Sequence, residues 1–351
     1  MSPSRPAGAS AEPAGGPTAP LFLAVDGGNS KTDVLLGAAD GGLLTHVRGP
    51  GSSPHQLGTA GAVALLGDLV ARARARAGLA PDAVLDRAEV YLAGADLPVE
   101  VAELTAAVGA AGWARTHRVD NDTFALLAAG TRDPAAVGVV CGAGINCVGR
   151  APDGRTARFP ALGQLTGDWG GGHHLAAMAL WHAARGEDGR GPATALSAAV
   201  AAHFGRATVE DVGIALHLGE LPRQRLDELT AVLFTVAEGG DPVALRLIGR
   251  QATEIVAMVR VAASRLRLLD REFTVVLGGG VLTARHPLLH QPITEGVAAI
   301  APAAAVTVVG RPPVVGAALL ALDALAADPE PFLARVTGPH LDRAAGADAA
   351  S

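Results

Sequence analysis

Three short, β-prone runs in this sequence end in glycine-rich turns, and these turns constrain the fold more than any other feature. VDGGNSKTDV (25–34) and VCGAGINCVG (140–149) each place such a turn between two apolar runs. When the two segments are superposed, the Asp-Gly turns that follow them, at 40–41 and 153–154, match to within two residues. The third run, VVLGGGV (275–281), leads into a helical pattern. The repeat predicts two related α/β domains, each opening with three strands around a glycine turn.

The rest of the chain alternates between β-type and helical patterns. Three strands are predicted between 21 and 49, and an amphipathic helix follows at 60–78. EVYLAGAD (89–96) is typical of a buried strand, and another helix is predicted at 98–112. A long helix at 242–269 has apolar residues at helical spacing, which indicates a core framework element rather than a partner-binding face.

Composition and charge restrict the class of protein. The 351 residues suffice for two domains of about 150 residues each, and 49% hydrophobic with 18% charged residues is typical of a globular protein. A formal net charge of -6 argues against nucleic acid as the main partner. No apolar run approaches the roughly 18 residues that a membrane span requires.

Both ends of the chain differ in composition from the rest. Residues 1–20 are rich in Pro, Ala, Gly and Ser and lack the regions of a signal peptide, so they are interpreted as a disordered leader. A mobile tail is expected at 326–351. Cys141 and Cys147 are too few for a disulfide framework, which together with the leader predicts a cytoplasmic protein.

The first glycine turn has two interpretations. It could be a plain hairpin turn, since short β-prone runs flank a cluster of Gly, Asn and Ser. However, Lys31 is the only lysine among 28 basic residues, and a compact ammonium beside two glycines suits a phosphate. Two similar domains would leave a cleft in which the glycine turns at 27–28, 142–144 and 278–280 could hold a nucleotide.

Five segments, in this order, resemble the actin-like ATPase and sugar kinase superfamily, and within it the BadF/BadG/BcrA/BcrD type that includes N-acetylglucosamine kinases. They are VDGGNSKTDVLL (25–36), VDNDTFALLAAG (119–130), GAGINCVG (142–149), GQLTGDWGGG (163–172) and LGGGV (277–281). The resemblance covers about residues 21 to 325. It implies two ribonuclease H-like domains with a nucleotide cleft between them, at 21–118 and 119–312, and a helix at 313–325 that returns to the N-terminal domain.

The resemblance also implies ATP and Mg²⁺ as cofactors. Asp26 would face the hydrated magnesium ion, because Mg²⁺ keeps several waters and takes only one or two carboxylates. The residues expected to bind ATP are Asp26, Gly27, Gly28, Asn29, Ser30, Lys31, Thr32, Gly142, Ala143, Gly144, Gly278, Gly279 and Gly280.

Asp122 is the catalytic residue that the resemblance implies. From the residues alone it could equally be the N-cap of the helix that follows. In the family reading its carboxylate accepts the proton of a sugar hydroxyl as that oxygen attacks the γ-phosphate. Asp120 is the rival carboxylate and is interpreted as a turn residue.

Asn146 and Asp168 are predicted to bind the sugar, because short amide and carboxylate groups each pair with neighbouring hydroxyls. Alternatively, Asn146 satisfies a strand edge and Asp168 caps the helix after the glycines. The sequence departs from the family pattern at Ala143, at Trp169 and in the loop 53–55, which leaves the sugar open. The adjacent His173 and His174 have no further ligand at zinc spacing.

Three functions are weighed. The first is an ATP-dependent kinase that phosphorylates an amino sugar, N-acetylglucosamine at its 6-hydroxyl being favoured, with no partner but the small molecule and a homodimer left open. The second is the branch of the family that activates a dehydratase or reductase through a shared iron–sulfur cluster. Cys141 and Cys147 lie on one hairpin, which disfavours a cluster at a subunit interface. The third is a sensor of sugar or nucleotide, for which no output module is visible.

Overall fold

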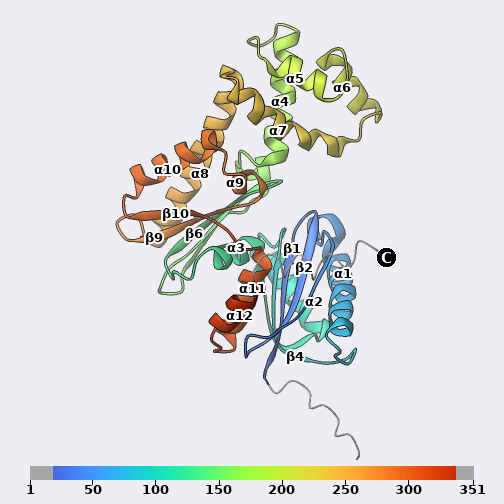
Figure 1. Cartoon of the computed structure of the whole chain (residues 1–351), viewed down its shortest axis with the longest axis vertical. Helices are drawn as coiled ribbons and strands as arrows, with labels where there is room; N and C mark the ends of the chain where they lie inside the picture. The colour runs from blue at the N-terminus through green and yellow to red at the C-terminus, as the bar shows by residue number, and fades with distance from the viewer. Residues whose placement is uncertain (1–18, 337–351) are drawn as a thin grey trace, which may run out of the picture.

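The computed structural model describes residues 19–336 and contains two five-stranded sheets of the same design (Figure 1). The first sheet has the order β3-β2-β1-β4-β5 and the second β8-β7-β6-β9-β10. In each, the first three strands form an antiparallel meander and the last two add in parallel to the first strand. The predicted pair of related α/β domains is therefore confirmed at the level of topology.

The strands of the first sheet are β1 (Leu21–Gly27), β2 (Lys31–Ala38), β3 (Leu43–Pro50), β4 (Leu85–Leu92) and β5 (Ala114–Asn121). Those of the second sheet are β6 (Ala136–Cys141), β7 (Ile145–Arg150), β8 (Thr156–Arg158), β9 (Phe273–Gly278) and β10 (Ala304–Val308). The first sheet has helices α1 (Pro54–Arg76) and α2 (Pro98–Ala111) packed on its outer face, as Figure 1 shows on the right. Helices α8 (Pro242–Leu266) and α10 (Pro287–Ile300) belong with the second sheet.

Four helices form a lobe that stands away from both sheets at the top of Figure 1: α4 (Gly172–Glu187), α5 (Leu196–His203), α6 (Val209–Leu218) and α7 (Leu229–Glu238). The remaining elements are α9 (Gly280–Thr283), α12 (Glu330–Arg335) and the 3₁₀ turns η1 (Gly163–Thr166) and η2 (Arg223–Glu228). No helix within 19–336 has both the length and the apolar character needed to cross a membrane.

Two predicted helices differ in extent from the structure. The first begins at Pro54 instead of residue 60, and Gly58, with φ of 69°, interrupts its opening turn. The long helix ends at Leu266, where Arg267 adopts a left-handed conformation that stops it. The domain limits drawn at 118, 312 and 325 stay predictions, and most of the leader lies outside the described residues. The part of the predicted mobile tail that is described includes α12 (Glu330–Arg335), whose Phe332 is fully buried against Phe22, while residues 337–351 lie outside the described residues.

Helices α3 (Asp122–Gly130) and α11 (Pro313–Ala324) form the layer between the two sheets. Nearly every residue of α3 is buried, because it packs on β6 of the second sheet and on α11, which itself lies on β1 of the first. The helices approach closely because α11 has Gly316 at their contact. A Cβ there would lie 1.9 Å from the Ala125 carbonyl oxygen and 2.5 Å from the Ala129 nitrogen.

We expect Gly316→Ala to destabilise the protein by about 1–3 kcal/mol, because the added methyl group would push α11 off the backbone of α3. The matched control is Gly249→Ala in the middle of α8, where a Cβ would meet no atom within 4 Å. That change should be neutral or stabilise by up to about 1 kcal/mol, since alanine favours the helix. Urea unfolding of both variants measures the difference, and equal stability of the two would contradict this packing.

Candidate functional site

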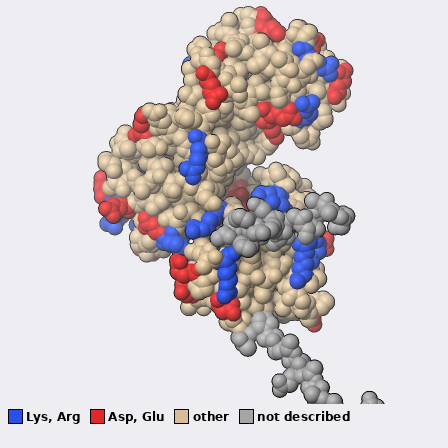
Figure 2. All heavy atoms as spheres, in the orientation of Figure 1, with Lys and Arg blue, Asp and Glu red and all other residues tan. Residues whose placement is uncertain are grey.

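Two cavities meet between the domains, beside the three glycine turns. One has a volume of ≈ 440 Å³ and is lined on one side by His55, Asp96 and Asn146. The other, of ≈ 460 Å³, extends toward Thr283 and Arg311. Both share the wall formed by Gly28, Lys31, Asp122, Val140, Gly279 and Gly280. On the face drawn in Figure 2 the molecule is hollowed between its lobes, and its acidic and basic groups are interspersed.

The glycine turns allow the backbone to come close to whatever fills these cavities. The Gly28 N–H donates to the Lys31 carbonyl at 2.8 Å, which closes the first turn. Gly279 has φ of 83°, and a Cβ there would lie 2.5 Å from the Cys141 carbonyl oxygen, so only glycine fits. Gly142, Ala143 and Gly144 line the 440 Å³ cavity, as do Asn29 and Ser30.

Lys31 is held loosely at the junction of the cavities. Its Nζ lies 3.4 Å from the Asp33 carboxylate, yet its side chain is 53% exposed. Asp33 is already paired with His46 at 2.9 Å and with Arg48 at 2.7 Å, and these two donors outweigh its burial and hold its pKa well below the usual range. Because Asp33 does not depend on Lys31, the ammonium can turn to an anionic ligand.

Asp26 is the least compensated carboxylate of the site. It is 9% exposed at the end of β1, and no hydrogen bond or ion pair from the described residues reaches it. Burial, with the nearby Asp122 and Asp33 charges, raises its pKa to about 8. A buried oxygen ligand without a protein partner fits a hydrated, hard cation such as Mg²⁺.

Asp122 begins α3 and is part of the wall that both cavities share. The N-cap reading of this residue is wrong, because the N-cap is Asn121, whose side chain accepts the Thr123 N–H at 2.9 Å. The Asp122 carboxylate is left facing the cavities, and burial raises its pKa to about 6. A pKa in this range suits a general base at neutral pH.

Asp120 is not a turn residue, as the sequence had suggested, but a buried member of β5. Its carboxylate accepts from Arg118 at 2.9 Å and from Arg158 at 2.5 Å, and it also accepts the Asn121 N–H. Fully paired, it is unsuited to accept a substrate proton.

Asp96, which sequence reasoning missed, lies at the centre of the 440 Å³ cavity wall. Its Oδ1 accepts from the side chains of Asn121 at 2.8 Å and Asn146 at 3.1 Å. Burial, followed by the charge of Asp122, raises its pKa to about 7. The signal was its place at the end of the predicted buried strand 89–96, because ligand groups gather at the carboxyl ends of parallel strands.

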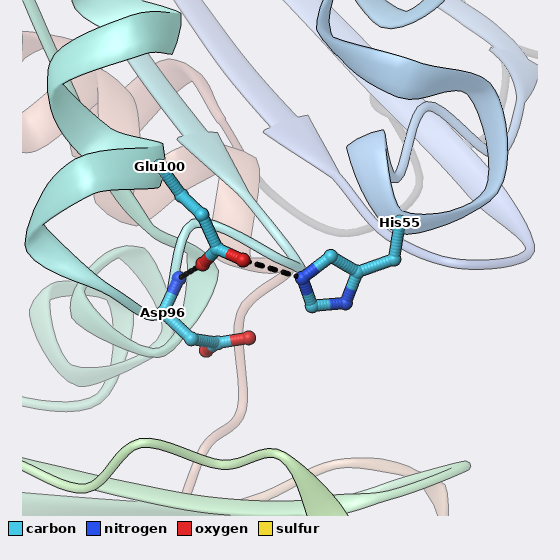
Figure 3. A group of neighbouring side chains, drawn as sticks. All are labelled: His55, Asp96 and Glu100. Carbon is cyan, nitrogen blue, oxygen red and sulfur yellow. Dashed lines mark hydrogen bonds and ion pairs between the residues drawn. The ribbon is translucent and has the colours of Figure 1, made fainter.

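His55, which lines this cavity, and Glu100 lie beside Asp96 (Figure 3). His55 Nε2 lies 3.0 Å from Glu100, and Glu100 accepts the backbone N–H groups of Asp96 and Leu97. Glu100 thus caps α2 and fixes the turn that presents the Asp96 carboxylate.

Some of the predicted site residues lie outside both cavity walls. Thr32 is buried and donates to Ser52, while Gly27 and Gly278 fill tight contacts in the sheets. Asp168 accepts from Thr166, and the N-cap of α4 is Gly171, so Asp168 does not cap this helix. Asn146 lines the cavity, although its Oδ1 also accepts the Cys147 N–H.

The two cysteines and the adjacent His173 and His174 line neither cavity. Cys141 and Cys147 are free and fully buried, and burial raises both thiol pKa values, that of Cys141 to about 12. His173 pairs with Asp227, whereas the ring of His174 packs on Trp169.

Comparisons with known proteins agree with this geometry. The BadF/BadG/BcrA/BcrD ATPase family model matches residues 23–321. An N-acetylmuramic acid/N-acetylglucosamine kinase of Clostridium acetobutylicum is 24% identical over 261 residues, which are 74% of this chain and 85% of that protein. An N-acetyl-D-glucosamine kinase of Dictyostelium discoideum is also 24% identical, over 86% of this chain and 98% of its own.

Solved structures share the fold. A candidate N-acetylglucosamine kinase from Chromobacterium violaceum superposes with a TM-score of 0.66 at 22% identity, covering 87% of this chain and all of that one. A ROK family glucokinase from Streptomyces griseus, in complex with glucose and AMPPNP, gives 0.52 at 18% identity, covering 86% and 99%. The predicted fold class, two ribonuclease H-like domains of the actin-like ATPase type, is confirmed. The chain belongs to the BadF/BadG/BcrA/BcrD ATPase family.

A pH prediction follows from Asp26. A folded-state pKa raised from 3.8 to about 8 means that Asp26 stabilises the fold fully below about pH 4 and that this contribution is lost as the pH rises toward 8. In the absence of magnesium, the free energy of unfolding of Asp26→Asn should therefore fall less between pH 4 and pH 8 than that of the parent, by a few kcal/mol at most. Thermal unfolding at pH 4, 6 and 8 is the measurement.

The exposed Asp270→Asn serves as the control and should follow the parent at every pH. Adding Mg²⁺ at pH 8 should raise the melting temperature of the parent but not of Asp26→Asn, because bound cation stabilises only the folded state. Identical pH profiles for the parent and Asp26→Asn would show that Asp26 is not an uncompensated charge.

Proposed function

We propose that this protein is an ATP-dependent carbohydrate kinase that phosphorylates an amino sugar, with N-acetylglucosamine as the favoured substrate and its 6-hydroxyl as the acceptor. The observation that carries the proposal is the position of Asp122 in the wall between two cavities. A kinase needs its base at the boundary between acceptor and phosphate donor, and this carboxylate lies there with a raised pKa.

In this assignment the sugar occupies the 440 Å³ cavity. Asp96 and Asn146 offer acceptor and donor groups that suit neighbouring hydroxyls, and His55 adds an adjustable donor at the mouth. ATP occupies the 460 Å³ cavity, with Thr283 and Arg311 at its far end and Lys31 with Gly28 beside the outer phosphates. The names of the two curated relatives support an N-acetylated amino sugar.

The reaction follows from these positions. Asp122 accepts the proton of the acceptor hydroxyl while that oxygen bonds to the γ-phosphorus, and the bond to the β,γ-bridging oxygen breaks to leave ADP. Lys31 and the backbone N–H groups of the glycine turns stabilise the charge on the transferring group. Mg²⁺, which Asp26 would hold through water, would neutralise the phosphates when bound.

The activator alternative is disfavoured by the cysteines. A cluster shared between two subunits needs thiolates at a surface, whereas Cys141 and Cys147 are fully buried and burial raises the pKa of both thiols. Neither sulfur can reach a partner subunit from the interior of the second sheet.

The test is ADP release over a panel of sugars, with Asp122→Asn as the variant. ATP consumption by the parent should rise sharply with an amino sugar, because the sugar hydroxyl is the acceptor. Asp122→Asn should lower kcat by about 100-fold or more while ATP affinity stays within a few-fold, as expected for the loss of a positioned base.

Asp270→Asn, at an exposed residue that lines neither cavity, should keep parental turnover and would show that removing one carboxylate is harmless in itself. If no sugar stimulates the parent, and protein purified without air contains stoichiometric iron, the activator function is correct instead. Near-normal turnover of Asp122→Asn would remove this residue from the catalytic role.

A further inference from the structure

One arginine of the second sheet holds the segment around Asp122 from both sides. Arg158, the last residue of β8, donates to Asp120 Oδ1 at 2.5 Å, and its guanidinium lies 4.7 Å from the centre of the Phe124 ring. Asp120 and Phe124 lie two residues before and two residues after Asp122. The arginine therefore contacts the segment on each side of the proposed base.

The sheet register explains why β8 can reach this segment. Arg158 pairs with Val148 on β7, and side chains at 146 and 148 share one face of a strand. That face meets α3, because Val148 belongs to the core between the sheets. Asn146, on the same face, donates to Asp96 at 3.1 Å, so the hairpin β7–β8 has two links to the ends of β4 and β5.

Charge balance does not require Arg158. Asp120 already pairs with Arg118 of its own strand at 2.9 Å, and the nearby Glu89 pairs with Arg87 and Tyr91. Arg158 adds a second cation to an already paired carboxylate, and it comes from the domain that carries the glycine turns 142–144 and 278–280. What it contributes beyond neutrality is a fixed relation between those turns and the segment 120–124.

We propose that Arg158 is a positioning residue for the transfer reaction. Its bond to Asp120 and its contact with Phe124 hold the head of α3 at a set distance from these glycine turns, so that the Asp122 carboxylate meets the acceptor hydroxyl in line with the γ-phosphate. The proposal rests on the proposed function for its catalytic consequence. Its structural part, the ordering of the segment 120–124 by an arginine of the second sheet, stands by itself.

The experiment compares Arg158→Ala, Asp120→Asn and the double variant with a matched control, Arg118→Ala. The control removes an arginine from the same carboxylate but from within the first sheet. Arg158→Ala should lower kcat about 10- to 100-fold while ATP affinity stays within about threefold. The reason is that a small displacement of a general base from its substrate removes much of its catalytic contribution. The double variant should lose less than the product of the two single losses, since both changes remove the contact between Arg158 and Asp120.

A conservative variant and an exchange measurement complete the test. Arg158→Lys keeps the positive charge but not the planar group, so its kcat should lie between those of Arg158→Ala and the parent. Because this variant still pairs a cation with Asp120, its loss of kcat cannot come from an unpaired buried carboxylate. Hydrogen exchange of the backbone N–H groups of 121–125 should be at least tenfold faster in Arg158→Ala than in Arg118→Ala. This readout does not depend on any sugar, so it decides the proposal even if the parent phosphorylates none.

Equal loss of kcat in Arg118→Ala and Arg158→Ala would overturn the proposal, because charge balance alone would then explain both. Unchanged exchange at 121–125 in Arg158→Ala would overturn it as well, because the order of this segment would then not depend on Arg158. Retention of kcat within threefold by a folded Arg158→Ala, in a parent that phosphorylates sugar, would do the same.

Discussion

The close packing of α3 on α11 is the contact on which the rest of this structure depends. Gly316 lets the two helices approach until backbone meets backbone, and the pair then fills the space between the sheets. Because α3 contacts both sheets, its first residue is placed at the boundary of the domains, where both cavities open. The proposed base thus lies at the boundary between the two cavities, on the helix that packs between the sheets.

Electrostatics accounts for much of the remaining character of the site. Burial raises the pKa values of Asp26, Asp96 and Asp122, and the charge of Asp122 raises those of the other two further. Such a group of carboxylates destabilises the fold at neutral pH and is typical of functional sites. Cations and polar ligands relieve the repulsion, which is why substrate and metal should stabilise the closed site.

The glycine turns and the strands around them could be predicted from sequence, because glycine at a strand end and period-two burial are local signals. Asp122 was identified through a family motif, but its alternative as an N-cap failed, since Asn121 competes for the same N–H groups. Asp120 was misread because its partner Arg158 lies 38 residues away on the second sheet, beyond any local pattern. Asp96 was missed for the same reason: its amide partners come from β5 and β7.

The central claim is that the γ-phosphoryl group of ATP is transferred to a sugar hydroxyl, with Asp122 as the base. The most direct measurement is phosphorus NMR of a reaction mixture containing the protein, ATP, Mg²⁺ and N-acetylglucosamine labelled with carbon-13. The account predicts ADP and, in equal amount, a phosphomonoester whose phosphorus couples to carbon 6 of the sugar. Release of inorganic phosphate with no phosphorus–carbon coupling would contradict it.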